Sequence, residues 1–228
     1  MLFRSGVISL FQPNRFYPDD DAYRQALSEA MRHEYRRIVD EGLDLQIDSP
    51  DLAVGKHTMY TELSEDEFLK RLDSHVAALN AALAGIPLSR VRLHVCWGNY
   101  EGPHIHDIPL ERILPTVLKI NAGAISFEAA NPRHEHEWSV FKRIRLPEGR
   151  KLLPGVIDSS TNFVEHPDLV AERLCRFAEV VGRDRVVAST DCGFATVADW
   201  NTVDPDIVWM KLESMAEGAR RATKVLWK

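Results

Sequence analysis

Five short apolar segments alternate with amphipathic helical segments along most of the 228-residue chain. Each apolar segment is rich in valine and isoleucine and is bounded by loop residues. These expected strands cover residues 43–48, 90–97, 123–128, 152–158 and 185–191. Strands that alternate with helices predict βαβ units and a parallel sheet. The pattern therefore predicts an α/β protein, with residues 1–228 as a single domain.

Amphipathic helices are predicted between these strands. In the first helix, apolar residues recur every three or four positions from Tyr23 to Ile38, and Gly42 follows its end. The second helix begins at Ser64, and Glu67 three positions later completes the pattern of a capping box. The predicted helices cover residues 19–41, 64–85, 109–120, 167–181 and 205–226, and residues 132–144 are expected to be only partly helical.

Two folds are compatible with this alternation. One is an open doubly wound sheet, but no glycine-rich phosphate loop follows any expected strand, which argues against nucleotide binding. The other is a (β/α)8 barrel, which usually needs about 250 residues for its eight units. Five units do not close a barrel, so the strand pattern alone leaves both folds open.

Composition and charge exclude several classes of partner. The chain has 28 Lys and Arg against 34 Asp and Glu, a formal net charge of -6, which gives no reason to expect binding to nucleic acid or to an anionic membrane. No apolar run approaches the roughly 18 residues of a membrane-spanning helix. The apolar stretch from Val7 to Phe11 is too short for a secretory signal. Three cysteines cannot form an even-numbered disulfide framework, so we expect reduced thiols in a cytoplasmic protein.

Polar residues capable of chemistry stand at the ends of the expected strands. They are Asp48, Glu128, Asp158, and Asp191 followed by Cys192. In an α/β barrel the C-terminal ends of the strands converge on the active site. The sequence therefore predicts a site at these strand ends, with Asp158 as one candidate catalytic residue.

The strand 90–97 carries His94 and Cys96, which are two positions apart and therefore point to the same face of the sheet. A thiolate beside an imidazole suits zinc, and Glu128 and Cys192 would complete a set of four ligands. The structural alternatives are that each cysteine is a small core residue and that Glu128 caps the next helix. Cys175 lies within a helix and is expected to be a core residue.

Other candidates follow the strand 90–97. His104 and His106 lie in a loop, where they would serve as general acids or bind a second metal, and a solvated loop is the alternative. Trp97 is a candidate wall of a substrate pocket, although an aromatic residue after a strand usually packs in the core. The polar run from His134 to Glu137 is expected to be a solvated face.

Five short motifs stand in one order along the chain. They are Gln46-Ile47-Asp48 followed by Pro50, His94-Val95-Cys96, Ile125-Ser126-Phe127-Glu128, Pro154-Gly155-Val156-Ile157-Asp158 and Asp191-Cys192-Gly193. As an ordered set they resemble the C-terminal catalytic domain of cobalamin-independent methionine synthase and the wider family of zinc-dependent thiol alkyltransferases. The resemblance extends over nearly the whole chain, from about Val7 to the end.

This resemblance implies a TIM-barrel type fold in which His94, Cys96, Glu128 and Cys192 bind one zinc ion. It also implies that Asp48 holds the amino group of a homocysteine-like thiol, which would attack a methyl group as a zinc-stabilised thiolate. Glu128 would give way to the incoming thiol. The activity so implied is methyl transfer that yields methionine in methionine biosynthesis, with a 5-methyltetrahydrofolate-type donor.

The sequence departs from the family at two places. The methionine synthases have a histidine acid two positions after the aspartate that matches Asp158, and Ser160 stands there in this chain. Either His104 or His106 supplies that proton, or the leaving group is not folate. The second departure is Trp97-Gly98-Asn99-Tyr100, which is similar to methionine-synthase-like proteins of uncertain substrate and to epoxyalkane coenzyme M transferases.

Further expectations concern alternative functions, the length of the chain and its assembly. Alkyl transfer to another thiol such as coenzyme M, and a zinc-binding barrel fragment without activity, are alternatives to methionine formation. A zinc hydrolase or lyase is disfavoured by the cysteine-rich ligand set. Because 228 residues provide about five of the eight barrel units, we expect that about three N-terminal units are missing. The sequence is also compatible with a homo-oligomer.

Overall fold

The computed structural model describes residues 2–3, 5–196, 199 and 202–228. Contacts divide the chain into two compact units. Unit 1 consists of Met1–Gly98 and His104–Ala124, and unit 2 consists of Asn99–Pro103 and Ile125–Lys228. The expected strand ends are therefore distributed over both units.

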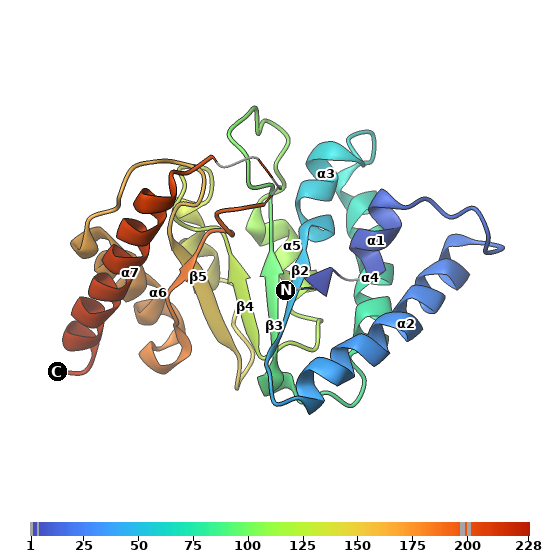
Figure 1. The fold of residues 1–228 in the computed structure, drawn as a ribbon, viewed down its shortest axis with the longest axis horizontal. Helices are drawn as coiled ribbons and strands as arrows, with labels where there is room; N and C mark the ends of the chain where they lie inside the picture. Colours follow the sequence, from blue (N-terminus) through green and yellow to red (C-terminus); the bar gives the residue numbers. More distant parts are fainter. Residues whose placement is uncertain (1, 4, 197–198, 200–201) are drawn as a thin grey trace. The chain divides into compact units, whose positions relative to one another are not determined.

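Parallel strands form the centre of unit 1. Strand β2 (Leu45–Ser49) pairs on one side with β1 (Leu2–Phe3) and on the other with β3 (Val91–Val95) (Figure 1). The register places Asp48 opposite His94. The strands predicted at 43–48 and 90–97 are confirmed within two residues at each end, whereas β1 was not predicted.

Helices surround these strands in unit 1. The predicted helices correspond to α2 (Asp20–Asp40), α4 (Glu65–Ala82) and α5 (Leu110–Val117), and the capping box of Ser64 and Glu67 before α4 is present. The sequence did not predict the short helices α1 (Ser5–Phe11) and α3 (Val54–Thr58), nor the 3₁₀ turns η1 (Pro50–Leu52) and η2 (Leu88–Arg90).

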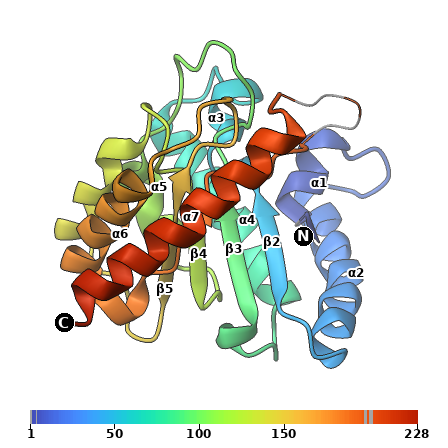
Figure 2. The same cartoon turned by 60° about the vertical axis from the view of Figure 1, so that its left-hand side comes forward.

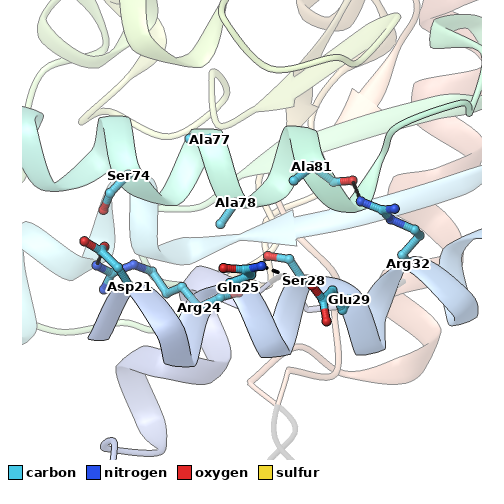
Figure 3. Close-up of a pocket in the computed structure, with 10 residues that line it drawn as sticks. All are labelled: Asp21, Arg24, Gln25, Ser28, Glu29, Arg32, Ser74, Ala77, Ala78 and Ala81. Carbon is cyan, nitrogen blue, oxygen red and sulfur yellow. Dashed lines mark hydrogen bonds and ion pairs between the residues drawn. The ribbon is translucent and has the colours of Figure 1, made fainter. Parts of the chain in front are cut away.

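A cavity of about 350 Å³ lies between α2 and α4 (Figure 3). Small residues of α4, including Ala77, Ala78 and Ala81, form one wall, and longer polar side chains of α2 form the other. Arg32 closes one end by donating from Nη2 to the carbonyl oxygen of Ala81 at 2.8 Å. None of the candidate site residues lines this cavity.

Unit 2 contains β4 (Ala124–Phe127), whose first residue belongs to unit 1, together with β5 (Lys151–Ile157) and β6 (Ser189–Thr190). Strands β5 and β6 are parallel, with an irregularity between Gly155 and Ile157. A 3₁₀ helix, η3 (Glu135–Lys142), occupies the segment that was expected to be partly helical, and η4 (Arg183–Arg185) precedes the segment leading to β6. The strand predicted at 185–191 is thus shorter than expected.

Two helices pack side by side in unit 2, α6 (Pro167–Val181) and α7 (Pro205–Leu226) (Figure 2). Both have the bounds predicted from the sequence. Gly218 of α7 allows the close approach, because a Cβ at this position would lie 2.4 Å from the side chain of Val170 on α6. Val156 and Ile157 of β5 belong to the same buried apolar cluster as Val170.

One expectation about surface exposure is wrong. His134 and Glu137 do not belong to a solvated face, because both side chains are buried, and Nδ1 of His134 lies 2.9 Å from Oε2 of Glu137. The three-residue spacing brings the two side chains together at the start of η3, where each satisfies the polar atoms of the other.

Among the described residues, no helix combines the length and the apolar character needed to span a membrane.

Candidate functional site

In unit 1, His94 lies within β3 and Cys96 follows its end, and both side chains are buried. The backbone N–H of Gly98 donates to Sγ of Cys96 at 3.3 Å, and Val54 N donates to the carbonyl oxygen of Cys96 at 3.2 Å. These contacts fix the position of Cys96 after the end of β3.

Asp48 stands at the end of β2, opposite His94 in the register. Burial raises the pKa of its carboxyl group to about 6, while His94 lowers that pKa and Cys96 and Asp51 raise it. Its Oδ1 is buried and makes no hydrogen bond within the part of the chain that the structure describes. A cationic group of a ligand would provide the missing partner for this oxygen.

Trp97 is fully buried, and its indole Nε1 donates to the carbonyl oxygen of Ile108 at 2.7 Å. Trp97 therefore packs as a core residue, which was the alternative to its prediction as the wall of a substrate pocket. Its hydrogen bond also connects the end of β3 to the segment before α5. Its contact with a substrate stays a prediction.

A cluster of three histidines forms in unit 1. Nδ1 of His104 lies 3.1 Å from each carboxylate oxygen of Asp107, and the ring of His57 stacks on that of His104 with centroids 5.3 Å apart. The ring of His106 lies 6.1 Å from that of His57, and its side chain is exposed. The two contacts with Asp107 fix the orientation of the His104 ring. No functional role was predicted for His57 from the sequence.

In unit 2, Glu128 follows the end of β4 and Cys192 follows β6, and both side chains are buried. Sγ of Cys192 lies 3.9 Å from Oε1 of Glu128. The other oxygen of Glu128, Oε2, accepts hydrogen bonds from Asn131 Nδ2 at 2.9 Å and Arg133 Nη2 at 2.7 Å. Neither Asn131 nor Arg133 was predicted from the sequence.

Asp191 organises the loop that follows Glu128. Its carboxylate accepts hydrogen bonds from the backbone N–H groups of Ala129, Ala130 and Asn131, at 2.8, 2.9 and 3.1 Å, and from Nδ2 of Asn131 at 2.9 Å. Burial raises the pKa of Asp191, although the hydrogen bonds from Ala129, Ala130 and Asn131 lower it. Gly155 leaves room for this carboxylate, because a Cβ there would lie 1.9 Å from Oδ1 of Asp191.

A second polar network holds the backbone of Cys192. Cys192 N donates to Oγ of Ser159 at 3.1 Å, and this hydroxyl donates to Oδ1 of Asn99 at 2.8 Å. Asn99 Nδ2 in turn donates to the carbonyl oxygen of Gly193 at 2.6 Å. Asn99 and Ser159 therefore flank the turn that presents Cys192, and the sequence did not predict either role.

Asp158, at the end of β5, is buried and forms a turn with the following serines. Its Oδ1 accepts hydrogen bonds from the backbone N–H of Ser160 at 3.0 Å and from its Oγ at 2.9 Å. The N–H of Asp158 donates to Oε1 of Glu165, whose Oε2 pairs with the fully buried Lys211 at 2.9 Å. Ser160 thus stabilises a turn at the position where the resemblance implies a histidine acid.

The four candidate zinc ligands fall into two pairs, with His94 and Cys96 in unit 1 and Glu128 and Cys192 in unit 2. All four side chains are buried, and together they offer one imidazole, two sulfurs and one carboxylate. Four ligands of these types suit a zinc ion, and the hydrogen bonds to the distal oxygen of Glu128 are typical of a carboxylate that supports a metal site. The residue types within each pair therefore suit zinc.

Parallel strands that end in buried cysteine, histidine and carboxylate side chains define an α/β protein equipped for thiol or metal chemistry. The chain belongs to the family described as cobalamin-independent synthase, catalytic domain, which it matches over residues 9–220. The predicted family is thereby confirmed, and the family supports methyl or alkyl transfer to a thiol.

Individual relatives differ in their activities. The chain is 27% identical over 173 residues to the 2-hydroxypropyl-CoM lyase of Xanthobacter autotrophicus, a match that covers 65% of this chain and 44% of that protein. It is 25% identical over 208 residues to the methionine synthase of Thermococcus kodakarensis, with coverage of 90% and 51%. The chain therefore spans about half the length of the curated relatives that it matches.

The fold is also similar to that of a solved B12-independent methionine synthase from Shewanella sp. W3-18-1, determined in complex with selenomethionine. The TM-score is 0.70 at 21% sequence identity, and the match covers 92% of this chain and 57% of that one. The expected fold class, a (β/α)8 barrel type with about five of the eight units, is confirmed.

Proposed function

We propose that this chain takes part in the zinc-dependent transfer of a methyl group to a small, homocysteine-like thiol, with methionine as the product. The observation that carries this proposal is the Glu128–Cys192 pair, in which two buried ligand-type side chains from separate strand ends lie 3.9 Å apart. Membership of the family supports the same chemistry.

His94, Cys96, Glu128 and Cys192 would hold one zinc ion. A tetrahedral zinc site needs four ligand positions. When bound, zinc supplies the Lewis acidity that keeps a substrate thiol deprotonated near neutral pH. Reduced cysteines are a condition for this ligation, which is consistent with the cytoplasm as the predicted compartment.

The remaining roles belong to side chains of this chain. Asp48 would bind the amino group of the thiol substrate, since its buried Oδ1 makes no hydrogen bond among the described residues. Glu128 would leave its ligand position when the thiol arrives, because its Oε2 keeps two protein partners. The role proposed for Asp158 is to support catalysis at the end of β5.

His104 is the proposed proton donor for the leaving group. Asp107 orients its ring, whereas His106 is exposed and its ring lies 6.1 Å from that of His57. Ser160 has a hydroxyl in place of an imidazole, and that hydroxyl donates to Asp158. We therefore place His104 ahead of His106 as the general acid.

A second candidate function is alkyl transfer to a thiol such as coenzyme M. The similarity to 2-hydroxypropyl-CoM lyase favours this alternative. So does Ser160, which stands where the resemblance to methionine synthases implies a histidine that protonates the folate leaving group. A zinc-binding chain without activity of its own is a third candidate, which the assay below distinguishes from the first two.

Metal analysis followed by a substrate assay tests the proposal. Protein purified without chelator is expected to hold about one zinc ion per chain. It should then consume methyl-folate only when homocysteine is present, and an epoxide with coenzyme M serves as the competing substrate pair. Protein without zinc refutes the proposed site. Zinc-loaded protein that is inactive with both pairs favours the third candidate.

A further inference from the structure

Asn131 occupies a position between two carboxylates of unit 2. Its Nδ2 donates to Oε2 of Glu128 at 2.9 Å and to Oδ2 of Asp191 at 2.9 Å. Its Oδ1 accepts a hydrogen bond from the backbone N–H of Arg133 at 3.1 Å. Because both neighbours of the nitrogen are carboxylates, the orientation of this amide is determined by its partners.

Asp191 provides a rigid anchor for this amide. Its carboxylate is nearly inaccessible to solvent and also accepts the N–H groups of Ala129, Ala130 and Asn131. The backbone of the loop and the side chain of Asn131 are thus held by the same carboxylate. A carboxylate bound by several donors is a strong point of attachment in the protein interior.

The hydrogen bond from Asn131 restricts the position of the Glu128 carboxylate. Oε2 of Glu128 is held by Asn131 and by Arg133, while Oε1 lies toward Sγ of Cys192. A carboxylate fixed in this way presents one oxygen to a ligand and keeps the other on the protein. Residues that hold a metal ligand in this manner typically change metal affinity when they are mutated, by about 10–100-fold.

We propose that Asn131 is a positioning residue for Glu128, which couples the carboxylate to Asp191 and makes it a one-oxygen, replaceable zinc ligand. This inference rests on the proposed function for the identity of the metal. Arg133 also binds Oε2, but its side chain is 28% exposed, whereas the amide of Asn131 is buried and is itself bound to Asp191.

A double-mutant cycle on zinc affinity tests this role. The variants are Asn131→Ala, Glu128→Ala and the double variant, with affinity measured by competition against a chromophoric chelator. In the presence of Glu128, Asn131→Ala is expected to weaken zinc binding about tenfold. In the Glu128→Ala background it should change the affinity by less than about twofold. An equal loss in both backgrounds overturns the inference.

Two further variants separate positioning from folding. Asn131→Asp keeps the acceptor for Arg133 N–H but loses both donors, so it should weaken zinc binding at least as much as Asn131→Ala. Asn80→Ala removes a side chain whose Nδ2 donates to Lys119 O and whose Oδ1 accepts from Asn121 N, and it should leave zinc affinity unchanged. A matching loss of zinc affinity in Asn80→Ala would mean that the effect is one of general stability.

A crystal structure of metal-free Asn131→Ala protein gives a readout that does not depend on zinc. The Glu128 carboxylate is expected to leave its position beside Cys192. An unmoved carboxylate overturns the inference even if the wild-type protein binds zinc. Wild-type protein that does not bind zinc, combined with a displaced carboxylate in the variant, refutes the proposed function and leaves the positioning role of Asn131 in place.

Discussion

Sγ of Cys192 lies 3.9 Å from Oε1 of Glu128, although 64 positions separate the two residues in the sequence. Each follows the end of a strand, and the loop hydrogen bonds of Asp191 and Ser159 hold both in place. A buried thiol and a buried carboxylate this close offer a sulfur and an oxygen as ligand atoms for one metal ion.

The cysteines differ in their expected contribution to zinc binding. Cys96→Ser and Cys192→Ser should each lose most of the zinc, because serine lacks the soft thiolate that zinc prefers. Cys175→Ser is the control, since Cys175 lies in α6, packs against an apolar cluster and should not affect zinc content. Zinc retained by both strand-end variants, measured by atomic absorption, would refute the ligand assignment.

Gly155→Ala should destabilise the protein. The new Cβ would lie 1.9 Å from Oδ1 of Asp191 and 2.7 Å from its Cα, so either β5 or the backbone at Asp191 must move. Overpacking of this kind costs roughly 1–3 kcal/mol in the free energy of unfolding, measured by urea denaturation. Gly55→Ala is the matched control, because its Cβ would make only ordinary contacts, at 3.6 Å or more. Equal stability of the two variants would contradict the close approach.

The buried pair of His75 and Asp51 should contribute strongly to the stability of unit 1. Nδ1 of His75 lies 2.8 Å from Oδ2 of Asp51, and both side chains are almost completely inaccessible to solvent. Asp51→Ala leaves this ring nitrogen without that partner, so we expect a loss of about 1–3 kcal/mol in unfolding free energy. Arg112→Ala, which breaks exposed ion pairs with Glu65 and Asp66, should cost less than about 1 kcal/mol. The reverse order would show that the buried pair is dispensable.

His104→Gln should slow the group-transfer step by roughly 100-fold or more with a donor whose leaving group needs a proton. Stopped-flow or single-turnover assays measure this step directly. The effect of His106→Gln should be much smaller, because that side chain is exposed. His166→Gln is the control, since His166 has a structural role as the cap at the N-terminus of α6. An unchanged rate in His104→Gln would assign the proton to another group.

Much of the fold could be predicted because hydrophobic periodicity is a local property. Helices α6 and α7 have the predicted bounds, since a proline begins each helix after a capping residue. The last strand was predicted too long. Its apolar residues Val186 and Val187 form only a single bridge and a hydrogen bond with Leu152, and regular pairing is limited to Ser189–Thr190.

The site was predicted only in part, for a physical reason. Ligand-type residues at strand ends are visible in the sequence because the strand pattern locates them. Asn131, Asn99 and Ser159 are not visible in this way, because their roles depend on loops that meet only in the folded chain. The burial of His134 was missed for a related reason, since its partner Glu137 makes a polar run look solvated.

The most direct test of the central claim is X-ray absorption at the zinc edge, recorded before and after the thiol substrate is added. If His94, Cys96, Glu128 and Cys192 bind one zinc ion and Glu128 gives way to the thiol, the spectrum should gain one sulfur ligand and lose one oxygen ligand. A sulfur count that does not change when the thiol binds would contradict the account.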